Sequence, residues 1–187
     1  YDGKPLPGTS VRAVDWDGRT RLAIHGPTLM TRYLDAESPF FDEGGHRWLL
    51  TGDLGIIRAS GTVEVRGRAD DVIVSGGLSI APGPVRRAVR SFDGISDAWI
   101  LGTPDEKWGH VVTALVVVDQ MPSDSPEMAE LGSAIRKHAA AHIGRAQAPR
   151  RIVAVEALPY LGFDKIDRTA AAQAAAEASG TEREWVR

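Results

Sequence analysis

The first third of the chain alternates short apolar runs with turn residues, a pattern typical of β-strands. Asp17-Gly18 and Ser60-Gly61 mark two of the turns. WDGR predicts a hairpin, because Asp-Gly accepts the positive φ of a tight two-residue loop. The predicted strands are 11–14, 20–26, 48–57 and 62–67.

After GRADD (67–71) the pattern becomes a mixture of helical and strand spacings. VIVSGGLSIAP (72–82) predicts two short strands around a glycine pair. In 82–92, Val85, Val89 and Phe92 recur at helical spacing. Helices are also predicted over 125–144, with Gly144 as its end, and over the alanine-rich 168–179, and strands over 97–102, 111–118 and 150–158.

These patterns predict an α+β protein in two parts. A β-rich part covers 1–67, a junction covers 68–71, and a part that mixes helices and strands covers 72–187.

Composition narrows the class of protein. A net charge of −3 gives no reason to expect a nucleic acid or an anionic membrane as partner. The absence of cysteine excludes disulfides and thiolate zinc sites, and it suits a reducing cytoplasm. The longest apolar run, VVTALVVV (111–118), is of strand length and too short to span a bilayer. Because the chain starts at YDGKPLPG, without an initiator methionine, we expect it to be a piece of a longer protein.

Two segments near the junction carry candidate binding residues. LLTGDLG (49–55) predicts Asp53 in a glycine-flanked turn, where its carboxylate could accept two hydroxyl groups of a ribose or bond its own backbone as an Asx-turn. In GRADDVIVSGG (67–77), Arg68 suits phosphate or ribose oxygens, or forms a surface ion pair with a neighbouring aspartate. Gly76-Gly77 would let a ligand or a second backbone come close, although no phosphate-loop signature is present.

A third segment, LPYLGFDKIDR (158–168), presents Lys165 on a Pro–Gly loop. On base rates this is a solvent-exposed surface lysine; the alternative is a cation held out to meet a ligand. The histidines predict no metal site, because the pair with helical spacing, His138 and His142, lacks a third ligand.

Taken in order with GPTLMTRYL (26–34) and DEKWGHVVTALVVV (105–118), these segments resemble the consecutive late motifs of the adenylate-forming enzymes. That family comprises acyl- and aryl-CoA ligases, luciferases and the adenylation domains of peptide synthetases. The resemblance runs from about Asp2 to Arg168. YDGKPLPG, RADDVIVSGG and LPYLG are most similar to the actinobacterial o-succinylbenzoate–CoA ligases of menaquinone biosynthesis.

The resemblance implies that 1–67 end a large domain built as a distorted barrel, that 68–71 form a hinge and that 72–187 form a mobile lid. It assigns ribose and nucleotide binding to Asp53 and Arg68, the hinge to Asp70, the thiol tunnel to Ser75, Gly76 and Gly77, and the adenylation cation to Lys165. Asp164 departs from the family, which has glycine before this lysine.

It further implies ATP (leaving as AMP) and CoA as ligands, Mg²⁺ brought by ATP, and a small carboxylic acid, o-succinylbenzoate, as substrate. Because earlier motifs precede Tyr1, we expect this chain alone to be inactive. A fatty acyl-AMP ligase, a carrier-protein-loading adenylation domain and a non-catalytic binding domain with the same fold stay open as alternatives.

Overall fold

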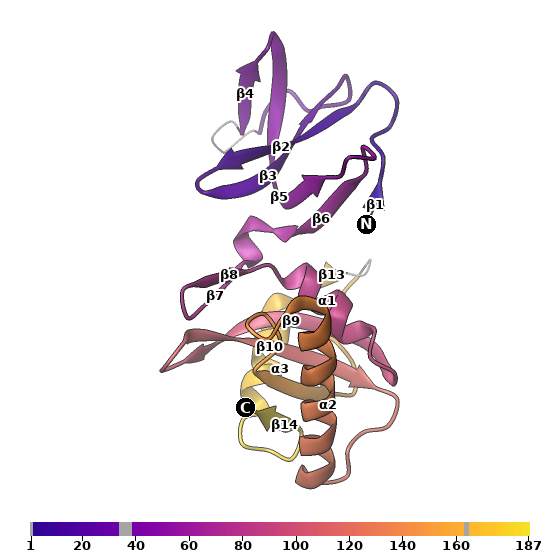
Figure 1. Cartoon of the computed structure of the whole chain (residues 1–187), viewed down its shortest axis with the longest axis vertical. Helices are drawn as coiled ribbons and strands as arrows, with labels where there is room; N and C mark the ends of the chain where they lie inside the picture. Colours follow the sequence, from indigo (N-terminus) through magenta and orange to yellow (C-terminus); the bar gives the residue numbers. More distant parts are fainter. Residues whose placement is uncertain (1, 34–38, 163–164) are drawn as a thin grey trace. The chain divides into compact units, whose positions relative to one another are not determined.

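The computed structural model describes residues 2–33, 39–162 and 165–187, which form two compact units, Tyr1–Asp71 and Val72–Arg187 (Figure 1). The first unit is built from strands and the second mixes strands with helices, as the hydrophobic pattern predicts. In the residues described, no helix is long and apolar enough to cross a membrane.

Unit Tyr1–Asp71 is a half-barrel antiparallel sheet with the strand order β1-β6-β5-β3-β2, in which β4 also pairs with β5. Its strands are β1 (Asp2–Gly3), β2 (Ser10–Trp16), β3 (Arg19–His25), β4 (Phe40–Glu43), β5 (His46–Ile57) and β6 (Val63–Arg68), followed by the 3₁₀ turn η1 (Ala69–Asp71). The predicted hairpin is confirmed, since Trp16 pairs with Arg19 and Asp17 and Gly18 have φ of 52° and 70°. The described apolar residues buried in this unit are Leu22, Ala23, Trp48 and Ala69.

Unit Val72–Arg187 has a sheet of order β14-β11-β10-β7-β8, with β9 also paired to β10. Its strands are β7 (Ile73–Ser75), β8 (Leu78–Ile80), β9 (Ile95–Asp105), β10 (Gly109–Val118), β11 (Arg151–Val155) and β14 (Glu184–Val186), and β12 (Tyr160–Leu161) and β13 (Lys165–Ile166) form a separate hairpin. The helices are α1 (Pro82–Arg90), α2 (Ser125–Ile143) and α3 (Arg168–Glu177).

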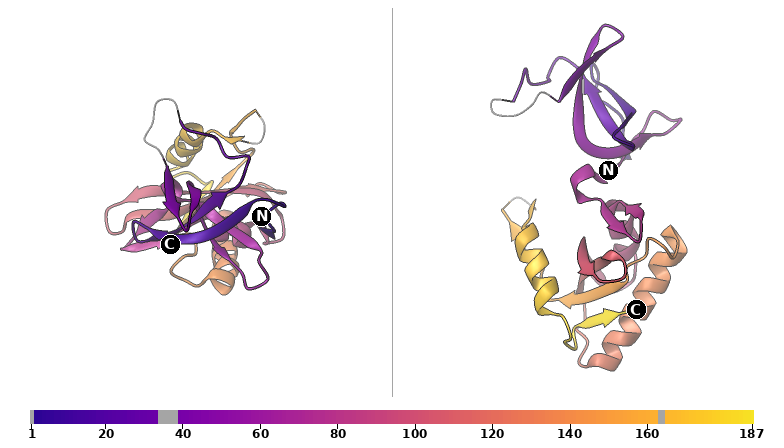
Figure 2. Two further views of the ribbon diagram at one scale, coloured as in Figure 1. Left: turned by 90° about the horizontal axis from the view of Figure 1, so that it is seen from above. Right: turned by 90° about the vertical axis from the view of Figure 1, so that its left-hand side faces the viewer.

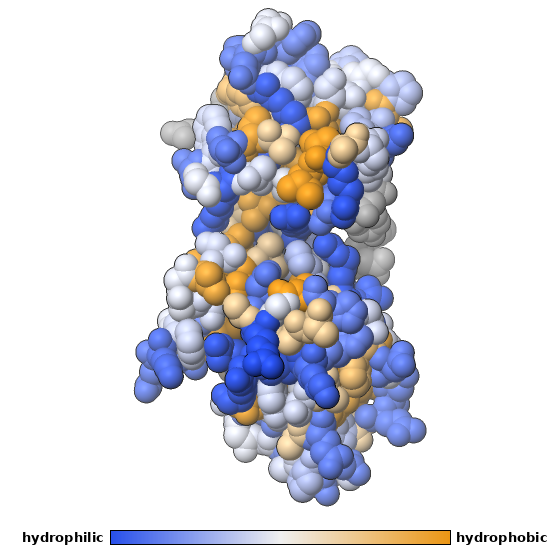
Figure 3. Space-filling model, in the orientation of Figure 1, coloured by the Kyte–Doolittle hydropathy of each residue, from blue (hydrophilic) through white to orange (hydrophobic). Residues whose placement is uncertain are grey.

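The helices of this unit cover both faces of its sheet (Figure 2). Alternate residues of β10 point to opposite faces: Ala114 and Val116 pack with α1 and α2, whereas Leu115 packs with Ala171 and Ala175 of α3. Apolar side chains also reach the surface of both units (Figure 3); in this unit Val74 and Leu78 of the β7–β8 hairpin are about half exposed.

Helix α2 is capped at its N-terminus by two acidic side chains. The Asp124 side chain accepts from the Glu127 N–H (2.9 Å), and the Glu127 carboxylate accepts from the Ser123 N–H (2.8 Å). The first bond satisfies a donor of the first helical turn, and the second fixes the residue that precedes the cap. The helix ends before Gly144, whose φ is 84°, so both ends of the predicted helix are confirmed.

Candidate active-site residues

Asp53 lies within strand β5, where it pairs with Arg68 of β6, so the prediction of a turn at this aspartate is wrong. The glycines that suggested a turn are needed for space. A Cβ on Gly52 would lie 2.6 Å from Arg68 Nη2, and a Cβ on Gly55 would lie 2.5 Å from the Glu64 carbonyl oxygen. Glycine therefore lets two neighbouring strands and an arginine side chain come close together without breaking the strand.

The Asp53 and Arg68 side chains face each other across these strands. Asp53 Oδ1 is 3.8 Å from Arg68 Nη1, and the two side chains are 41% and 50% exposed. This separation is longer than a hydrogen bond. The carboxylate oxygens therefore stay available to hydroxyl donors, with a cation fixed beside them.

Arg68 is also 3.4 Å from Asp70, which is 70% exposed. This is the surface ion pair that the sequence left open as an alternative, and exposed pairs contribute at most about 1 kcal/mol. The backbone at this point is held from the side: Arg19 Nη1 donates to the Ala69 carbonyl at 2.8 Å. Asp70 thus lies in η1, and the division between the two units follows directly after Asp71.

Ser75, Gly76 and Gly77 lie at the tip of the β7–β8 hairpin, where Ser75 pairs with Leu78 around the two glycines. Gly76 and Gly77 have φ of 55° and 82°, which suits glycine in a two-residue hairpin loop. The three residues differ in access. Ser75 is only 6% exposed, whereas a Cβ on Gly77 would meet nothing within 4 Å.

Sequence reasoning missed Trp108, which covers Gly76. A Cβ on Gly76 would lie 2.7 Å from Trp108 Cζ3, and the Gly76 N–H donates to the Trp108 carbonyl at 3.0 Å. The Arg150 guanidinium lies 4.1 Å from the centroid of the Trp108 ring, within range of a cation–π contact. The Trp-Gly pair in DEKWGH was the available signal, because Gly109 (φ 71°) ends the turn that positions the indole.

Lys165 lies in strand β13, paired with Leu161, rather than in an irregular loop. It is exposed, and the next residue, Ile166, is 8% exposed and belongs to the core beneath α3. Strand alternation therefore points the ammonium outward while its neighbour anchors the strand. The prediction about Asp164 falls outside the described residues.

The hairpin that carries Lys165 is tied to the body of its unit through Tyr160. The Tyr160 hydroxyl donates to Asp97 of β9, whose carboxylate also binds Arg86 (3.0 Å) and Arg90 (3.5 Å) of α1. Partial burial raises the pKa of Asp97, but the bonds from Tyr160, Arg86 and the Ala98 N–H outweigh it and hold that pKa below its ordinary value. Burial, and then the bond to Asp97, raise the pKa of Tyr160.

Among the described residues, no group of three or more histidine, aspartate or glutamate side chains could hold a metal ion. The ring centroids of His138 and His142 are 4.4 Å apart with the rings tilted by 40°, and His138 Nε2 hydrogen-bonds Ser91 Oγ at 2.9 Å.

Comparison with known proteins links the chain to one family. The family model of the AMP-binding enzyme C-terminal domain matches residues 87–161. A probable 2-succinylbenzoate–CoA ligase of Mycobacterium tuberculosis is 37% identical over 174 residues, which cover 91% of this chain and 43% of that protein. The medium/long-chain-fatty-acid–CoA ligase FadD8 of the same organism is 32% identical, over 90% of this chain and 31% of the relative. The chain thus spans less than half the length of these relatives.

Solved structures are also similar to this chain. The o-succinylbenzoate CoA synthetase of Bacillus subtilis, solved with its acyl-adenylate intermediate, is 27% identical with a TM-score of 0.71, covering 89% of this chain and 34% of that one. ATP-bound MatB of Rhodopseudomonas palustris, at 23% identity, shares the fold with a TM-score of 0.75, over 91% of this chain and 35% of that one. With an AMP-binding enzyme C-terminal domain and ligase relatives along nine-tenths of its length, the chain belongs to the adenylate-forming family.

Proposed function

We propose that this chain is the C-terminal part of an ATP-dependent acid–CoA ligase. The observation that carries the proposal is the cross-strand pair of Asp53 and Arg68, because a carboxylate beside a guanidinium suits the hydroxyl groups of a ribose. The small buried core of unit Tyr1–Asp71 supports its role as the end of a larger domain. Unit Val72–Arg187, with helices on both sheet faces, would be the mobile lid.

The reaction has two steps. A carboxylate oxygen of the acid attacks the α-phosphorus of ATP, and the bond from that phosphorus to the oxygen bridging it to the β-phosphate breaks. Pyrophosphate departs, and the acyl-adenylate remains. The sulfur of CoA, having lost its proton, then attacks the acyl carbon, and the bond to the phosphate oxygen breaks to release AMP. Magnesium would arrive with the ATP phosphates, because the described side chains hold no carboxylate cluster for it.

Each candidate residue has a role in this scheme. Asp53 accepts the ribose hydroxyls, and Arg68 adds donors in a fixed fork. Lys165 stabilises the negative charge that builds on the α-phosphate in the first step, which lowers the barrier more than it tightens substrate binding. Its place on a hairpin of the lid lets it withdraw before the second step.

Asp70 would be the hinge about which the lid turns, because it lies in η1, directly before the division between the two units after Asp71. The Ser75-Gly76-Gly77 tip would line the path of the CoA thiol. Because Ser75 is buried and Trp108 covers Gly76, we assign the open backbone of that path to Gly77.

For the acid, 2-succinylbenzoate is the first candidate, because the 37% identical relative bears that name. A medium- or long-chain fatty acid is the second, favoured by the similarity to FadD8. Measuring thioester formation with each acid separates these two candidates. Comparing CoA with a phosphopantetheinyl carrier protein as the thiol acceptor separates a CoA ligase from a carrier-protein-loading domain. On the first candidate the enzyme would work in menaquinone biosynthesis in the cytoplasm.

The test uses the intact enzyme that contains this chain. Lys165→Ala should abolish acid-dependent ATP–pyrophosphate exchange while leaving thioester formation from a preformed acyl-adenylate nearly unchanged. Lys4→Ala, an exposed lysine in the other unit, is the matched control and should affect neither step. Equal loss of both steps in Lys165→Ala would refute the role given to this lysine. ATP–pyrophosphate exchange by the 187-residue chain alone would contradict its assignment as a part.

A further inference from the structure

A basic hollow of about 550 Å³ lies between the C-terminal half of α2 and strand β14. Its lining contains four cationic side chains and no aspartate or glutamate among the residues that the structure describes there. The side chains that matter to its chemistry are Arg136, Lys137, Arg145, Arg187, Ser133 and Trp185.

Arg136 is the buried floor of this hollow, only 7% exposed. Its guanidinium donates to the carbonyls of Ala148 (2.9 Å), Pro149 and Arg145 (3.2 Å). Burial first, and then the nearby guanidiniums of Arg187, Arg150 and Arg145, lower its pKa to about 10. Arg136 is therefore still charged at neutral pH, and the neighbouring charges repel it.

A structural role explains Arg136 but not the rest of the cluster. Three backbone carbonyls satisfy its donors, as expected for an arginine that ties a helix to the following loop. Lys137, Arg145 and Arg187 are exposed on the same hollow, and its lining has no aspartate or glutamate side chain to neutralise them. An anion seated there would supply the missing negative charge.

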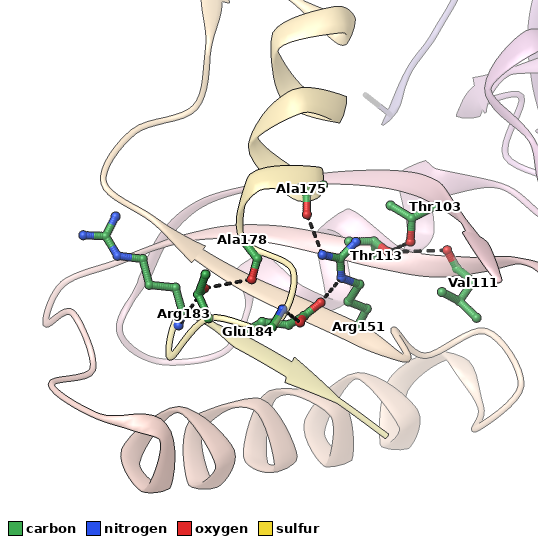
Figure 4. Close-up of polar contacts among 10 residues, drawn as sticks. Thr103, Val111, Thr113, Arg151, Ala175, Ala178, Arg183 and Glu184 are labelled. Atoms are coloured by element: carbon green, nitrogen blue, oxygen red, sulfur yellow. Dashed lines mark hydrogen bonds and ion pairs between the residues drawn. The ribbon is translucent and has the colours of Figure 1, made fainter.

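The wall opposite α2 is already fixed in place. Trp185 packs directly on Gly132, where a Cβ would lie 2.8 Å from the indole Cδ2 atom. The preceding residue, Glu184, forms an ion pair with Arg151, whose guanidinium also donates to the Ala175 carbonyl (Figure 4). The Arg187 N–H donates to the Arg150 carbonyl at 3.1 Å. The strand that presents Trp185 and Arg187 therefore loses little further freedom when a ligand binds.

We propose that this hollow binds a small organic phosphate carrying two phosphoryl groups, with its organic part against Trp185. Guanidinium groups bind phosphate oxygens in a bidentate fashion, and the Ser133 hydroxyl can add a further donor. The inference concerns one face of unit Val72–Arg187 and does not depend on the proposed ligase function.

The experiment is calorimetric titration of the 187-residue chain with pyrophosphate, ADP and adenosine 3′,5′-bisphosphate, and with adenosine as the uncharged probe. We expect at least one phosphorylated probe to bind, and its affinity to fall as salt is added. Binding of pyrophosphate as tight as that of both nucleotides would show that Trp185 contributes nothing and would overturn the assignment of an organic ligand.

Lys137→Gln combined with Arg145→Gln should weaken binding at least tenfold. Both side chains are exposed, so the fold should persist, which helical circular dichroism checks. Lys4→Gln combined with Arg32→Gln removes the same charge from the other unit and should leave the affinity unchanged. No binding by any phosphate probe, or equal weakening in the two double variants, would overturn the proposal.

Discussion

The ion pair between Arg151 and Glu184 should be a main support of the unit Val72–Arg187. The two side chains are only 11% and 9% exposed, and they join β11 to β14. Glu184 also accepts from the Gly180 N–H at 2.6 Å, and Arg151 donates to the last turn of α3 through the Ala175 carbonyl (Figure 4). Three elements thus depend on one buried pair.

Glu184→Gln keeps the shape of the side chain but removes its charge, leaving the Arg151 guanidinium buried without a counterion. Removing one partner of a buried pair costs about 3–5 kcal/mol. Glutamine can still accept one hydrogen bond, so we expect the lower end, about 3 kcal/mol. The matched control is Glu156→Gln. Its pair with Arg183 joins the same two regions but is 78% and 49% exposed, so its loss should cost less than about 1 kcal/mol.

Urea unfolding followed by helical circular dichroism measures this free energy. The three helices described all lie in Val72–Arg187, so the signal reports that unit. Arg151→Leu combined with Glu184→Leu should recover much of the loss, because neither charge then has to be buried. If Glu184→Gln costs no more than Glu156→Gln, the pair does not support the unit and the reasoning is wrong.

Three further predictions concern the hairpins near the candidate site. In the intact enzyme, Tyr160→Phe should slow adenylation about fivefold, equivalent to about 1 kcal/mol, and spare the thioester step; equal slowing of both steps would contradict a positioning role. Asp97→Asn should lower the free energy of unfolding at neutral pH, because a carboxylate with a lowered pKa stabilises the fold there. The difference in free energy from wild type should vanish as the pH falls through that pKa, below 3.8. A difference in urea unfolding that does not change with pH would argue against this role. Gly76→Ala should lower the free energy of unfolding by about 1–3 kcal/mol, because it combines a positive φ with a clash against Trp108. Gly77→Ala also has a positive φ but meets open space, so it should lower that free energy by about 1 kcal/mol. Equal losses in the two variants would show that the indole moves aside.

The sequence predicted the elements whose signal is local. The Asp17-Gly18 hairpin, helix α2 up to Gly144 and the buried strand β10 depend on turn chemistry, helical spacing and an apolar run, which are read from neighbouring residues. Strands β4 and β14 were missed. Each is short and pairs at the edge of its sheet, so it exists only because a partner strand offers free backbone groups.

The candidate site divides in the same way. The order of whole segments, GPTLMTRYL, LLTGDLG, GRADDVIVSGG and LPYLGFDKIDR, was sufficient to point to a family by resemblance, whereas Asp53, Arg68 and Lys165 taken singly were not. Tertiary structure decided their setting. A Cβ on Gly55 would meet the Glu64 carbonyl oxygen of the neighbouring strand, which no local pattern of turn residues reveals.

By itself, then, the sequence determined the longer strands, the three α-helices and the likeness to adenylate-forming enzymes. Only the tertiary structure brought Tyr160 to Asp97, Trp108 over Gly76, and Arg136 together with Arg145 and Arg187. The physical reason is distance along the chain: contacts between residues tens of positions apart follow from sheet order and side-chain packing, which no short window of sequence contains.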